Sequence, residues 1–330
     1  MGEMDQKVMT FSVIMPLYNK APYVEKAIRS VLEQTYSHYE LIVINDGSTD
    51  NSAEIAEKLL EGVANAKFIN QHNLGVATTR NNGVAIAKGE YVCFLDADDW
   101  WDVSFLQEMS LFIQEYPEAG IWGTNYWYVK RGMTRVGVRC ETGYINYPLV
   151  YKSQTSMPLW TGAVSMSKET FFKYGGFPVG IKLGEDFLLW TKIALEHKVA
   201  FLNKTVAYYN NDVPATMRAT RNLHKPEHHM LFMMSELADA VANNISNKED
   251  WAALLDWLRV NGLLEYWLSD EYHERAKHEL AKVDWSKQPS SIKKLYAMPI
   301  CFLRTKRAVR VILSYFKQTL IRLIVREEKC

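Results

Sequence analysis

The sequence predicts an α/β protein, with a mostly parallel sheet flanked by helices and an α-helical appendage after it. Three observations indicate this fold class. Short apolar runs alternate with segments of helical periodicity over the first hundred residues, polar loops follow the runs, and the chain beyond residue 226 shows helical periodicity alone. Strands and helices in alternation pair in parallel through right-handed crossovers, and such sheets bind ligands beyond the carboxyl ends of their strands.

Each predicted strand is a short apolar run, and each predicted helix has apolar residues three or four positions apart. In the first helix, Val24, Ile28 and Val31 share one face. Proline stops the first run, and the turn residues after the second run supply a helix start. The predicted strands are 11–16, 39–45, 66–70 and 90–95, and the helices between them are 22–34, 52–60 and 75–87.

The fourth predicted strand ends in three carboxylates, in the run Asp96-Ala97-Asp98-Asp99. Like charges this close are costly unless a cation lies among them, and Mg²⁺ or Mn²⁺ takes one or two carboxylates beside the phosphates of a substrate. The alternative is an acidic helix N-cap, because the residues after Trp101 have a helical pattern. The cluster alone leaves both interpretations open.

Turn residues and polar residues also follow the other three predicted strands. They are Pro16, Leu17, Tyr18 and Asn19 after the first strand, Asp46 and Ser48 after the second, and Gly75 after the third. Because the carboxyl ends of parallel strands meet at one edge, the four strand ends can converge on one ligand. The glycine-rich motifs of dinucleotide and phosphate-loop sites are absent, as is the Gly-x-Ser-x-Gly nucleophile motif.

The composition, 48% hydrophobic and 23% charged over 330 residues, is that of a globular protein with one large domain and an appendage. The four cysteines are widely spaced, without disulfide or metal spacing, which favours a reducing cytoplasm. The first ten residues are too polar for a signal peptide, and no run of 18 apolar residues is present to span a bilayer. We therefore expect a cytoplasmic protein.

The net charge of zero hides a strongly basic C-terminal segment. Residues 287–330 carry eleven Lys and Arg against two acidic residues. Apolar residues recur there at helical spacing, so residues 291–330 are typical of a basic amphipathic helix that lies on an anionic membrane, here the inner face of the cytoplasmic membrane. A helix docked on its own domain is the alternative. Nucleic acid is disfavoured, because the basic residues accompany an aliphatic stripe without stacking aromatics.

Five motifs together resemble the family 2 glycosyltransferases with the GT-A fold, whose sheet is Rossmann-like. They follow the family's order over residues 11–215: Pro16-Leu-Tyr-Asn, Ile44-Asn-Asp-Gly-Ser-Thr-Asp50, Asn73-Leu-Gly-Val-Ala-Thr-Thr-Arg80-Asn81, Phe94-Leu-Asp-Ala-Asp-Asp99 and Gly184-Glu-Asp186. The resemblance implies inverting, metal-dependent transfer of a sugar, with Mn²⁺ or Mg²⁺, from a nucleotide-diphosphate donor such as a UDP-sugar. For an enzyme of the bacterial polysaccharide type, we expect a saccharide acceptor that is lipid-linked.

The resemblance also implies roles for residues after the strands. Asp46 would hydrogen-bond the base, with an Asx-turn that shapes the loop as the alternative. Pro16, Tyr18 and Asn19 would line the base and ribose. Arg80 would clamp phosphate or pair with Asp46. The same motifs include the remaining predicted nucleotide-sugar residues Leu17, Ser48, Gly75, Asp96, Ala97 and Asp98.

Within the acidic cluster, the resemblance implies that Asp98 holds the metal and that Asp96 contacts ribose or a metal-bound water. Asp99 would cap the next helix. The general base would be Asp186, with its neighbour Glu185 as the rival, because a carboxylate within reach of the acceptor hydroxyl can take its proton. Trp160, Thr161 and Gly162 lie in a segment similar to the floor of the sugar pocket, where Trp160 would stack on a sugar or pack in the core.

One segment departs from the family. Relatives often carry Tyr-Arg-x-His about twenty residues after the acidic pair, whereas this chain has Tyr209-Asn210-Asn211-Asp212. We therefore expect Arg218, Arg221 or His224 to cover the diphosphate, or Asp212 to serve as a ligand. A solvated loop is the alternative for Arg218 and Arg221.

We predict a glycosyltransferase domain over residues 1–225, with a nucleotide-binding half at 11–100 and an acceptor half at 101–225. A helical appendage at 226–288 and the basic tail at 289–330 follow. A sugar-1-phosphate nucleotidyltransferase is the alternative enzyme class, but it needs a glycine-rich basic loop in place of residues 16–19. A catalytically silent, membrane-bound scaffold is the third hypothesis, against which the intact carboxylates argue.

Overall fold

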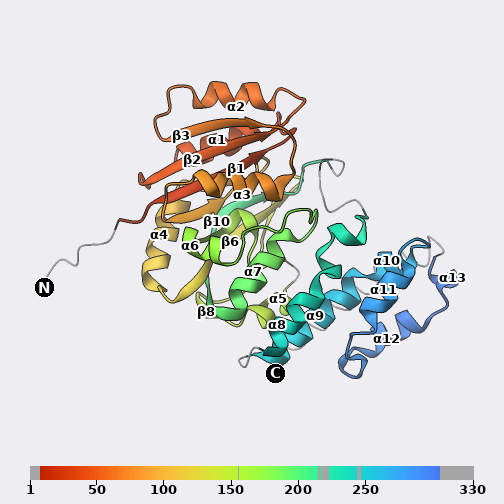
Figure 1. Ribbon diagram of the computed structural model, residues 1–330. Coiled ribbons are helices and arrows are strands. Elements are labelled where there is room, and N and C mark those ends of the chain that lie inside the picture. The colour runs from red at the N-terminus through yellow and green to blue at the C-terminus, as the bar shows by residue number, and fades with distance from the viewer. Residues whose placement is uncertain (1–7, 155, 215–216, 218–222, 244–246, 305–330) are drawn as a thin grey trace, which may run out of the picture. The chain divides into compact units, whose positions relative to one another are not determined.

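The computed structural model describes residues 8–154, 156–214, 217, 223–243 and 247–304 (Figure 1). The chain forms two compact units, residues 1–247 and 248–330. The first unit contains the sheet and its helices, and the described part of the second contains helices without strands. The division falls after residue 247, later than the predicted boundary at 225, because α8 (Met234–Asn243) packs against α7 (Glu185–Glu196) of the first unit.

The described strands form one sheet in the order β3-β2-β1-β4-β9-β6-β10-β5, with β7 beside β6 and β8 beside β10. Strands β3, β2, β1 and β4 are parallel neighbours, and β6 is parallel to β10. Between these groups, β9 is antiparallel to both β4 and β6. The bounds are β1 Phe11–Leu17, β2 Tyr39–Asp46, β3 Ala66–Gln71, β4 Tyr91–Phe94, β5 Trp100–Trp101, β6 Ala119–Lys130, β7 Met133–Val136, β8 Gly143–Ile145, β9 Val164–Ser167 and β10 Lys198–Asn210.

The fold class predicted from the sequence is confirmed, and the first seven elements lie within a few residues of their predicted bounds. Apolar runs of this length form strands because both faces of the parallel strands are covered by helices. The remaining helices of the first unit follow β4. The α-helices of the first unit are α1 Val24–Leu32, α2 Ser52–Leu60, α3 Val76–Ile86, α4 Phe105–Glu115, α5 Tyr147–Ser153, α6 Lys168–Lys173, α7 and α8.

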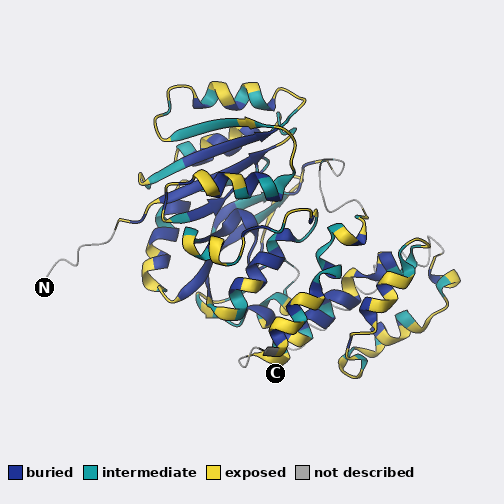
Figure 2. Ribbon diagram, in the orientation of Figure 1, coloured by how far each residue is buried: buried dark blue, intermediate teal, exposed yellow. Residues whose placement is uncertain are grey.

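Alternate residues of the central strands enter two hydrophobic layers, and these strands are the most buried part of the sheet (Figure 2). Val13 and Met15 of β1 belong to the core shared with α1 and α4. Ile14 points to the other face of the sheet, toward α3. A Cβ atom added to Gly83 of α3 would lie 2.4 Å from the Cγ2 atom of Ile14. Close approach of α3 to the sheet therefore requires glycine at this position.

On the same face as Ile14, Phe94 at the end of β4 packs against aromatic rings from the second half of the unit. Its ring centroid lies 5.0 Å from that of Phe177 and 6.4 Å from that of Trp190 in α7. Edge-to-face and tilted aromatic contacts of this kind add to the free energy gained by burial. They fix α7 against the end of β4, which brings residues 185 and 186 to the same edge of the sheet as residues 96–98.

The strand register aligns the carboxyl ends of the parallel strands. Leu17 pairs with Asn45, and Asn45 pairs with Asn70, so β1, β2 and β3 end side by side. The pairing of β4 with β1 extends to Leu95, the last residue before the acidic cluster, because the Leu95 N–H donates to the Ile14 carbonyl. The loops after the four strands therefore emerge at one edge, as the sequence predicted.

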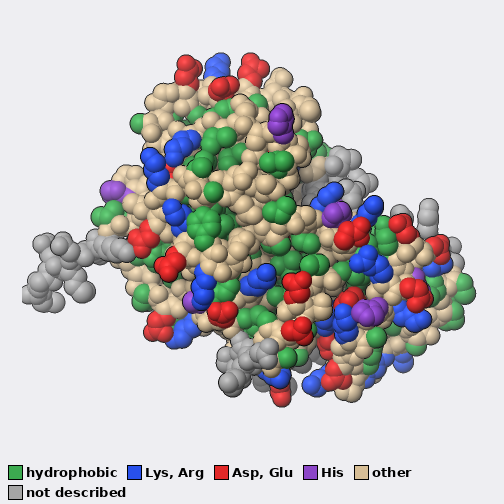
Figure 3. Space-filling model, viewed as in Figure 1, with side chains coloured by type: hydrophobic (Ala, Val, Ile, Leu, Met, Phe, Trp, Pro, Cys, Tyr) green, Lys and Arg blue, Asp and Glu red, His purple; other side chains and the backbone are tan. Residues whose placement is uncertain are grey.

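The second unit consists, in its described part, of α9 Lys248–Gly262, α10 Leu264–Leu268, α11 His273–Leu280, α12 Ser290–Ala297 and α13 Ile300–Leu303. Leu264, Leu295 and Leu303 share a small core, and the Tyr296 hydroxyl donates to the Val260 carbonyl. Residues 290–303, which the sequence placed in the tail, thus pack with the helical unit. Acidic and basic side chains are interspersed on the face of this unit seen in Figure 3.

The rest of the basic tail, residues 305–330, lies outside the described residues. Among the helices that are described, none combines the length and the apolar character needed to cross a membrane.

Candidate active site

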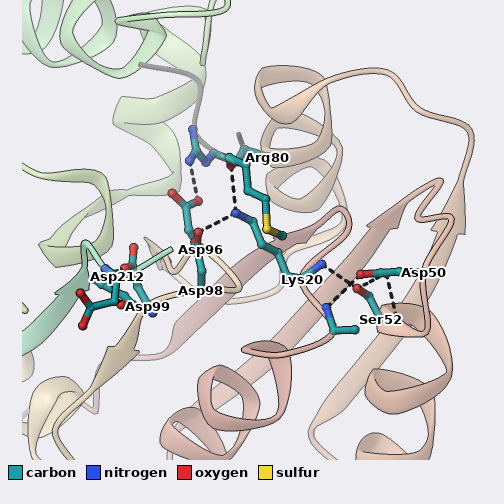
Figure 4. A network of polar contacts seen from close by, with 11 residues as sticks. Lys20, Asp50, Ser52, Arg80, Asp96, Asp98, Asp99 and Asp212 are labelled. Atoms are coloured by element: carbon teal, nitrogen blue, oxygen red, sulfur yellow. Dashed lines mark hydrogen bonds and ion pairs between the residues drawn. The ribbon is translucent and has the colours of Figure 1, made fainter. Parts of the chain in front are cut away.

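The carboxylates that follow β4 are held by two cations from other parts of the first unit (Figure 4). Asp96 accepts a hydrogen bond from Arg80 Nη2 at 2.6 Å, and Asp98 accepts one from Lys20 Nζ at 2.6 Å. Burial raises the pKa of the Asp98 carboxyl, and the charge of Asp96 adds to this, while Lys20 opposes both. The end of β4 is therefore a place where negative charge is concentrated and positive charge is favoured.

Arg80 joins the two halves of the first unit. It lies in α3 with a side chain 4% exposed, and its second amino group, Nη1, donates to Glu185 Oε1 at 2.9 Å. The pKa of Arg80 is raised because the charges of Asp96 and Glu185 outweigh the effect of burial. The Nε atom of Arg80 is buried without a hydrogen-bond partner among the described residues. The pairing of Arg80 with Asp46, one of its two predicted roles, is wrong, because the guanidinium turns toward β4 and α7 instead.

Lys20, which the sequence motifs did not include, reaches Asp98 from the loop after β1. Its Nζ atom also donates to the Met217 carbonyl at 3.3 Å. The signal that could have revealed it is position alone, because a lysine directly after Asn19 begins at the same sheet edge as the acidic cluster. A long side chain from that edge can reach the neighbouring strand end.

Asp46 at the end of β2 is 3% exposed and shapes the loop between β3 and α3. Its Oδ1 atom accepts hydrogen bonds from the Leu74 N–H and from Gln71 Nε2, both at 2.8 Å, and its Oδ2 atom accepts one from the Gly75 N–H at 3.0 Å. Gly75 has φ 86°, which suits glycine. The Asx-turn raised as the alternative is not made by Asp46, because in its own loop Asn45 Oδ1 accepts the Ser48 N–H at 3.1 Å. The predicted contact of Asp46 with a base stays a prediction.

The loops after β1 and β2 are fastened to each other by Asn19. Its φ is 51°, and its side-chain oxygen accepts the Thr49 N–H at 2.8 Å, while its own N–H donates to Ser48 Oγ at 3.1 Å. Asparagine tolerates this left-handed conformation better than most residues. Tyr18 beside it is 46% exposed, so its ring is available to a ligand, in keeping with its predicted place beside the base.

Three predicted donor-site residues have buried side chains. Pro16 is inside β1 and pairs with Ile44, Leu17 is fully buried in the core, and Ala97 is 2% exposed. Any contact of these residues with a ligand would therefore use backbone atoms. Arg218 and Arg221, predicted to cover the diphosphate, lie outside the described residues.

Asp99 does not cap the following helix, so this expectation is wrong. Its Oδ1 atom accepts the Asn210 N–H of β10 at 2.7 Å, and its carboxyl is fully buried, which raises its pKa well above the usual value. Asp102 makes the turn before α4 instead, because it accepts hydrogen bonds from the N–H and hydroxyl of Ser104. Asp212 lies near Asp99 in Figure 4, and its carboxylate accepts the Arg131 N–H at 2.6 Å.

Asp186 stands in the first turn of α7 and is held by neutral donors. The Thr161 hydroxyl donates to its Oδ2 atom at 2.7 Å, and the Phe187 N–H donates to its Oδ1 atom at 2.7 Å. Gly184 before the helix has φ 85°. Carboxylates in the first helical turn are stabilised by the unpaired N–H groups there.

The segment that carries Thr161 packs against β4, β6 and β10. The Trp101 indole N–H donates to the Gly162 carbonyl at 2.7 Å, and a Cβ on Gly162 would come within 2.5 Å of the Trp160 ring. Trp160 is 8% exposed and packs against Tyr126 and Tyr209. The core-packing alternative for Trp160 is therefore realised, and its small exposed part leaves a sugar contact a prediction.

Glu185, the predicted rival of Asp186, has a different environment. Burial, followed by the neighbouring charge of Asp186, raises the pKa of Glu185 to about 7, although Arg80 opposes this. Its side chain is turned to Arg80 and is 11% exposed. The two adjacent acids thus differ in their partners: Glu185 contacts an arginine, and Asp186 accepts a hydrogen bond from a hydroxyl.

The residues after β4 suit a divalent cation that completes its coordination with other ligands. No group of three or more His, Cys, Asp or Glu placed to hold a metal occurs among the described residues. Two oxygen ligands, from Asp98 and Asp96, still fit Mg²⁺ or Mn²⁺, which keep waters and bind phosphate oxygens alongside few protein carboxylates.

Solved structures share this fold, which is that of the GT-A class. A structure of S. aureus TarS residues 1–349 in complex with UDP-GlcNAc superposes with a TM-score of 0.70 at 21% identity, over 94% of this chain and 92% of that one. The mannosyltransferase PcManGT from Pyrobaculum calidifontis, in complex with GDP-Man and Mn²⁺, gives a TM-score of 0.54 at 19% identity, over 97% and 87%.

The sequence comparisons agree with this class. Residues 12–171 match the family model described as Glycosyl transferase family 2. Glycosyltransferase GlyA of Streptococcus pneumoniae is 32% identical over 244 residues, which are 70% of this chain and 34% of GlyA, so the chain spans about a third of that relative. Glycosyltransferase GlyG of the same organism is 25% identical over 276 residues, 80% of this chain and 89% of GlyG. The chain belongs to glycosyltransferase family 2.

Proposed function

We propose that this chain transfers a sugar from a nucleotide-diphosphate donor, a UDP-sugar, to a hydroxyl of a saccharide acceptor, with inversion at the anomeric carbon. One observation carries the proposal. Arg80 contacts Asp96 after β4 and Glu185 at the start of α7. This supports a single site that would include the donor-side carboxylates and Asp186, the residue after Glu185. The complex of TarS with UDP-GlcNAc supports uridine as the base, because that protein shares the fold.

The donor would lie across the ends of β1, β2 and β4. Asp46 and Tyr18 would contact the base, and Asp98 would hold Mg²⁺ or Mn²⁺. Asp96 would contact the ribose or serve as the second metal ligand. A divalent cation at that position would neutralise the charge that develops on the departing diphosphate. The Mn²⁺ in the PcManGT complex supports a metal in this fold.

Asp186 would act as the general base. Its carboxylate accepts hydrogen bonds from a hydroxyl and an N–H and keeps lone pairs for the proton of the acceptor hydroxyl. The acceptor oxygen would then attack the anomeric carbon while the bond to the nucleoside diphosphate breaks. A single displacement inverts that carbon, and it needs no covalent enzyme intermediate.

The acceptor side would be formed by the Trp160–Gly162 segment, with a lipid-linked saccharide of a cell-surface polysaccharide as substrate. We also propose that residues 305–330 bind the anionic inner face of the cytoplasmic membrane, which places the enzyme beside such an acceptor. A chain that ends at Arg304 keeps α12 and α13 and tests this. It should lose binding to vesicles of anionic lipid, and equal binding by both chains would contradict the membrane role.

A screen of nucleoside diphosphates and nucleotide sugars tests the central proposal. With Mn²⁺ or Mg²⁺ present, UDP at a hundred times its dissociation constant should stabilise the folded protein by about 2.7 kcal/mol, which thermal unfolding detects. A UDP-sugar should also release UDP when acceptor is added. If no nucleoside diphosphate shifts the unfolding temperature in the presence of either metal, the proposal fails.

A further inference from the structure

Lys20 forms an ion pair with Asp98, the carboxylate that would hold a metal in the proposed function. Its Nζ atom lies 2.6 Å from Asp98 Oδ2, and the side chains of Lys20 and Asp98 are 16% and 17% exposed. Figure 4 shows the lysine directed from the loop after β1 to the residues after β4. The pair is therefore largely withdrawn from solvent, where a charge requires a partner.

The backbone at Lys20 is fixed, while its side chain can move. The Lys20 N–H donates to Ser52 Oγ at 2.7 Å, and the Ala21 N–H donates to Asp50 Oδ2 at 3.1 Å, so the start of α2 holds this part of the loop. The ammonium group stands at the end of a flexible four-carbon chain. It can change its partner without any movement of the loop.

A divalent cation and Lys20 would compete for the Asp98 carboxylate. A divalent cation bound to the Asp98 carboxylate would lie close to the ammonium of Lys20, and like charges at that separation repel strongly when solvent is excluded. A diphosphate that arrives with the metal brings several negative oxygens to the same place. It would supply the ammonium of Lys20 with a new partner when the metal binds the Asp98 carboxylate.

We propose that Lys20 couples metal binding to donor binding, because its ammonium holds Asp98 in the donor-free enzyme and moves to a diphosphate oxygen when the metal–nucleotide complex binds. The inference rests on the proposed function. Free metal then binds weakly, and metal and nucleotide strengthen each other's binding, since each removes a cost of the other.

Lys20→Met tests this coupling, because methionine keeps most of the apolar stem and removes the charge. Mn²⁺ binding to the full chain is measured from the electron paramagnetic resonance signal of free Mn²⁺, with and without UDP. We expect the variant to bind Mn²⁺ alone about tenfold more tightly and to bind UDP with Mn²⁺ about tenfold more weakly than the unmodified protein. Lys20→Arg, which keeps a cation, should behave like the unmodified protein.

Lys26→Met is the matched control, because Lys26 lies in the same region of the chain but stands over the Trp100 ring. It should leave both affinities unchanged. If Lys20→Met does not fold, Lys20→Gln replaces it, since an amide can still donate to Asp98 without a charge.

Equal Mn²⁺ affinity with and without the Lys20 charge overturns the inference, while UDP and Mn²⁺ binding by the unmodified protein would leave the proposed function standing. If the unmodified protein binds no UDP at all with Mn²⁺, the proposed function fails and the inference fails with it.

Discussion

The carboxylates after β4 and the carboxylate at the start of α7 are held in opposite ways. Asp96 and Asp98 face the cations Arg80 and Lys20, whereas Asp186 accepts its hydrogen bonds from the Thr161 hydroxyl and a backbone N–H. A cation balances the charge of the carboxylate that it contacts, whereas a hydroxyl and an N–H bring no net charge to Asp186. The contrast teaches that one site can keep carboxylates for binding charge apart from a carboxylate for proton transfer.

The largest expected effect separates Asp186 from its neighbour. Asp186→Asn should lower kcat for sugar transfer by about 10²–10⁴-fold, because the amide cannot take the acceptor proton. The affinity for UDP with Mn²⁺ should stay unchanged, as calorimetric titration will show. Glu185→Gln is the matched variant and should retain far more activity. If Glu185→Gln is the more severe change, Glu185 is the base and the contrast between the two sides is reversed.

The second effect concerns the cation shared by the two sides. Arg80→Met leaves the largely buried Glu185 and the partly exposed Asp96 without their partner, which should lower the free energy of unfolding by about 3–5 kcal/mol. Urea denaturation measures this. Arg29→Met removes an exposed pair with Glu25 and should cost less than about 0.5 kcal/mol. Similar losses in the two variants would mean that the Arg80 bridge contributes no more than a surface pair.

The third effect is a pH dependence that belongs to Glu185. The pKa of Glu185 is raised to about 7 in the folded protein. As the pH rises, the unfolded state loses this proton first, at the ordinary pKa of a glutamate, and the folded state keeps it until about pH 7. The free energy of unfolding should therefore fall by about 2 kcal/mol between pH 5 and pH 7 through this group.

Glu185→Gln should remove this part of the pH dependence, as urea denaturation at the two pH values will show. Glu54→Gln, at an exposed position in the first turn of α2, is the control and should leave the dependence as it is. An unchanged slope in Glu185→Gln would show that the Arg80 charge fully offsets the effect of burial on the pKa of Glu185.

The smallest effect tests the neutral donor on the Asp186 side. Thr161→Val removes the hydroxyl that donates to Asp186 and should lower kcat by about tenfold, the size expected for one hydrogen bond to a charged group. KM for the donor should change little. Thr161→Ser keeps the hydroxyl and should restore activity. Failure of the serine variant to do so would assign the loss to packing rather than to the hydrogen bond.

The sequence predicts the first four strands and their polar ends well, although β1 continues through Pro16 to Leu17 and does not stop at the proline. Hydrogen-bond partners from distant parts of the chain cannot be predicted from such local patterns. Asp99 follows a strand and precedes a helix, which is typical of a cap, yet its partner is Asn210 in β10. Lys20 and Thr161 likewise have their roles through contacts with residues 98 and 186, which only the folded chain brings near.

The buried Arg80 bridge limits how such enzymes can be recombined. Arg80 belongs to the segment that ends with β4, and Glu185 belongs to the segment that begins after it, yet each is buried against the other. A chimaera that takes residues 1–100 from one relative and the remainder from another would leave a buried charge unmatched wherever the two parents differ at these positions. A chimaera designed to change donor specificity should therefore take residues 80, 96 and 185 from the same parent.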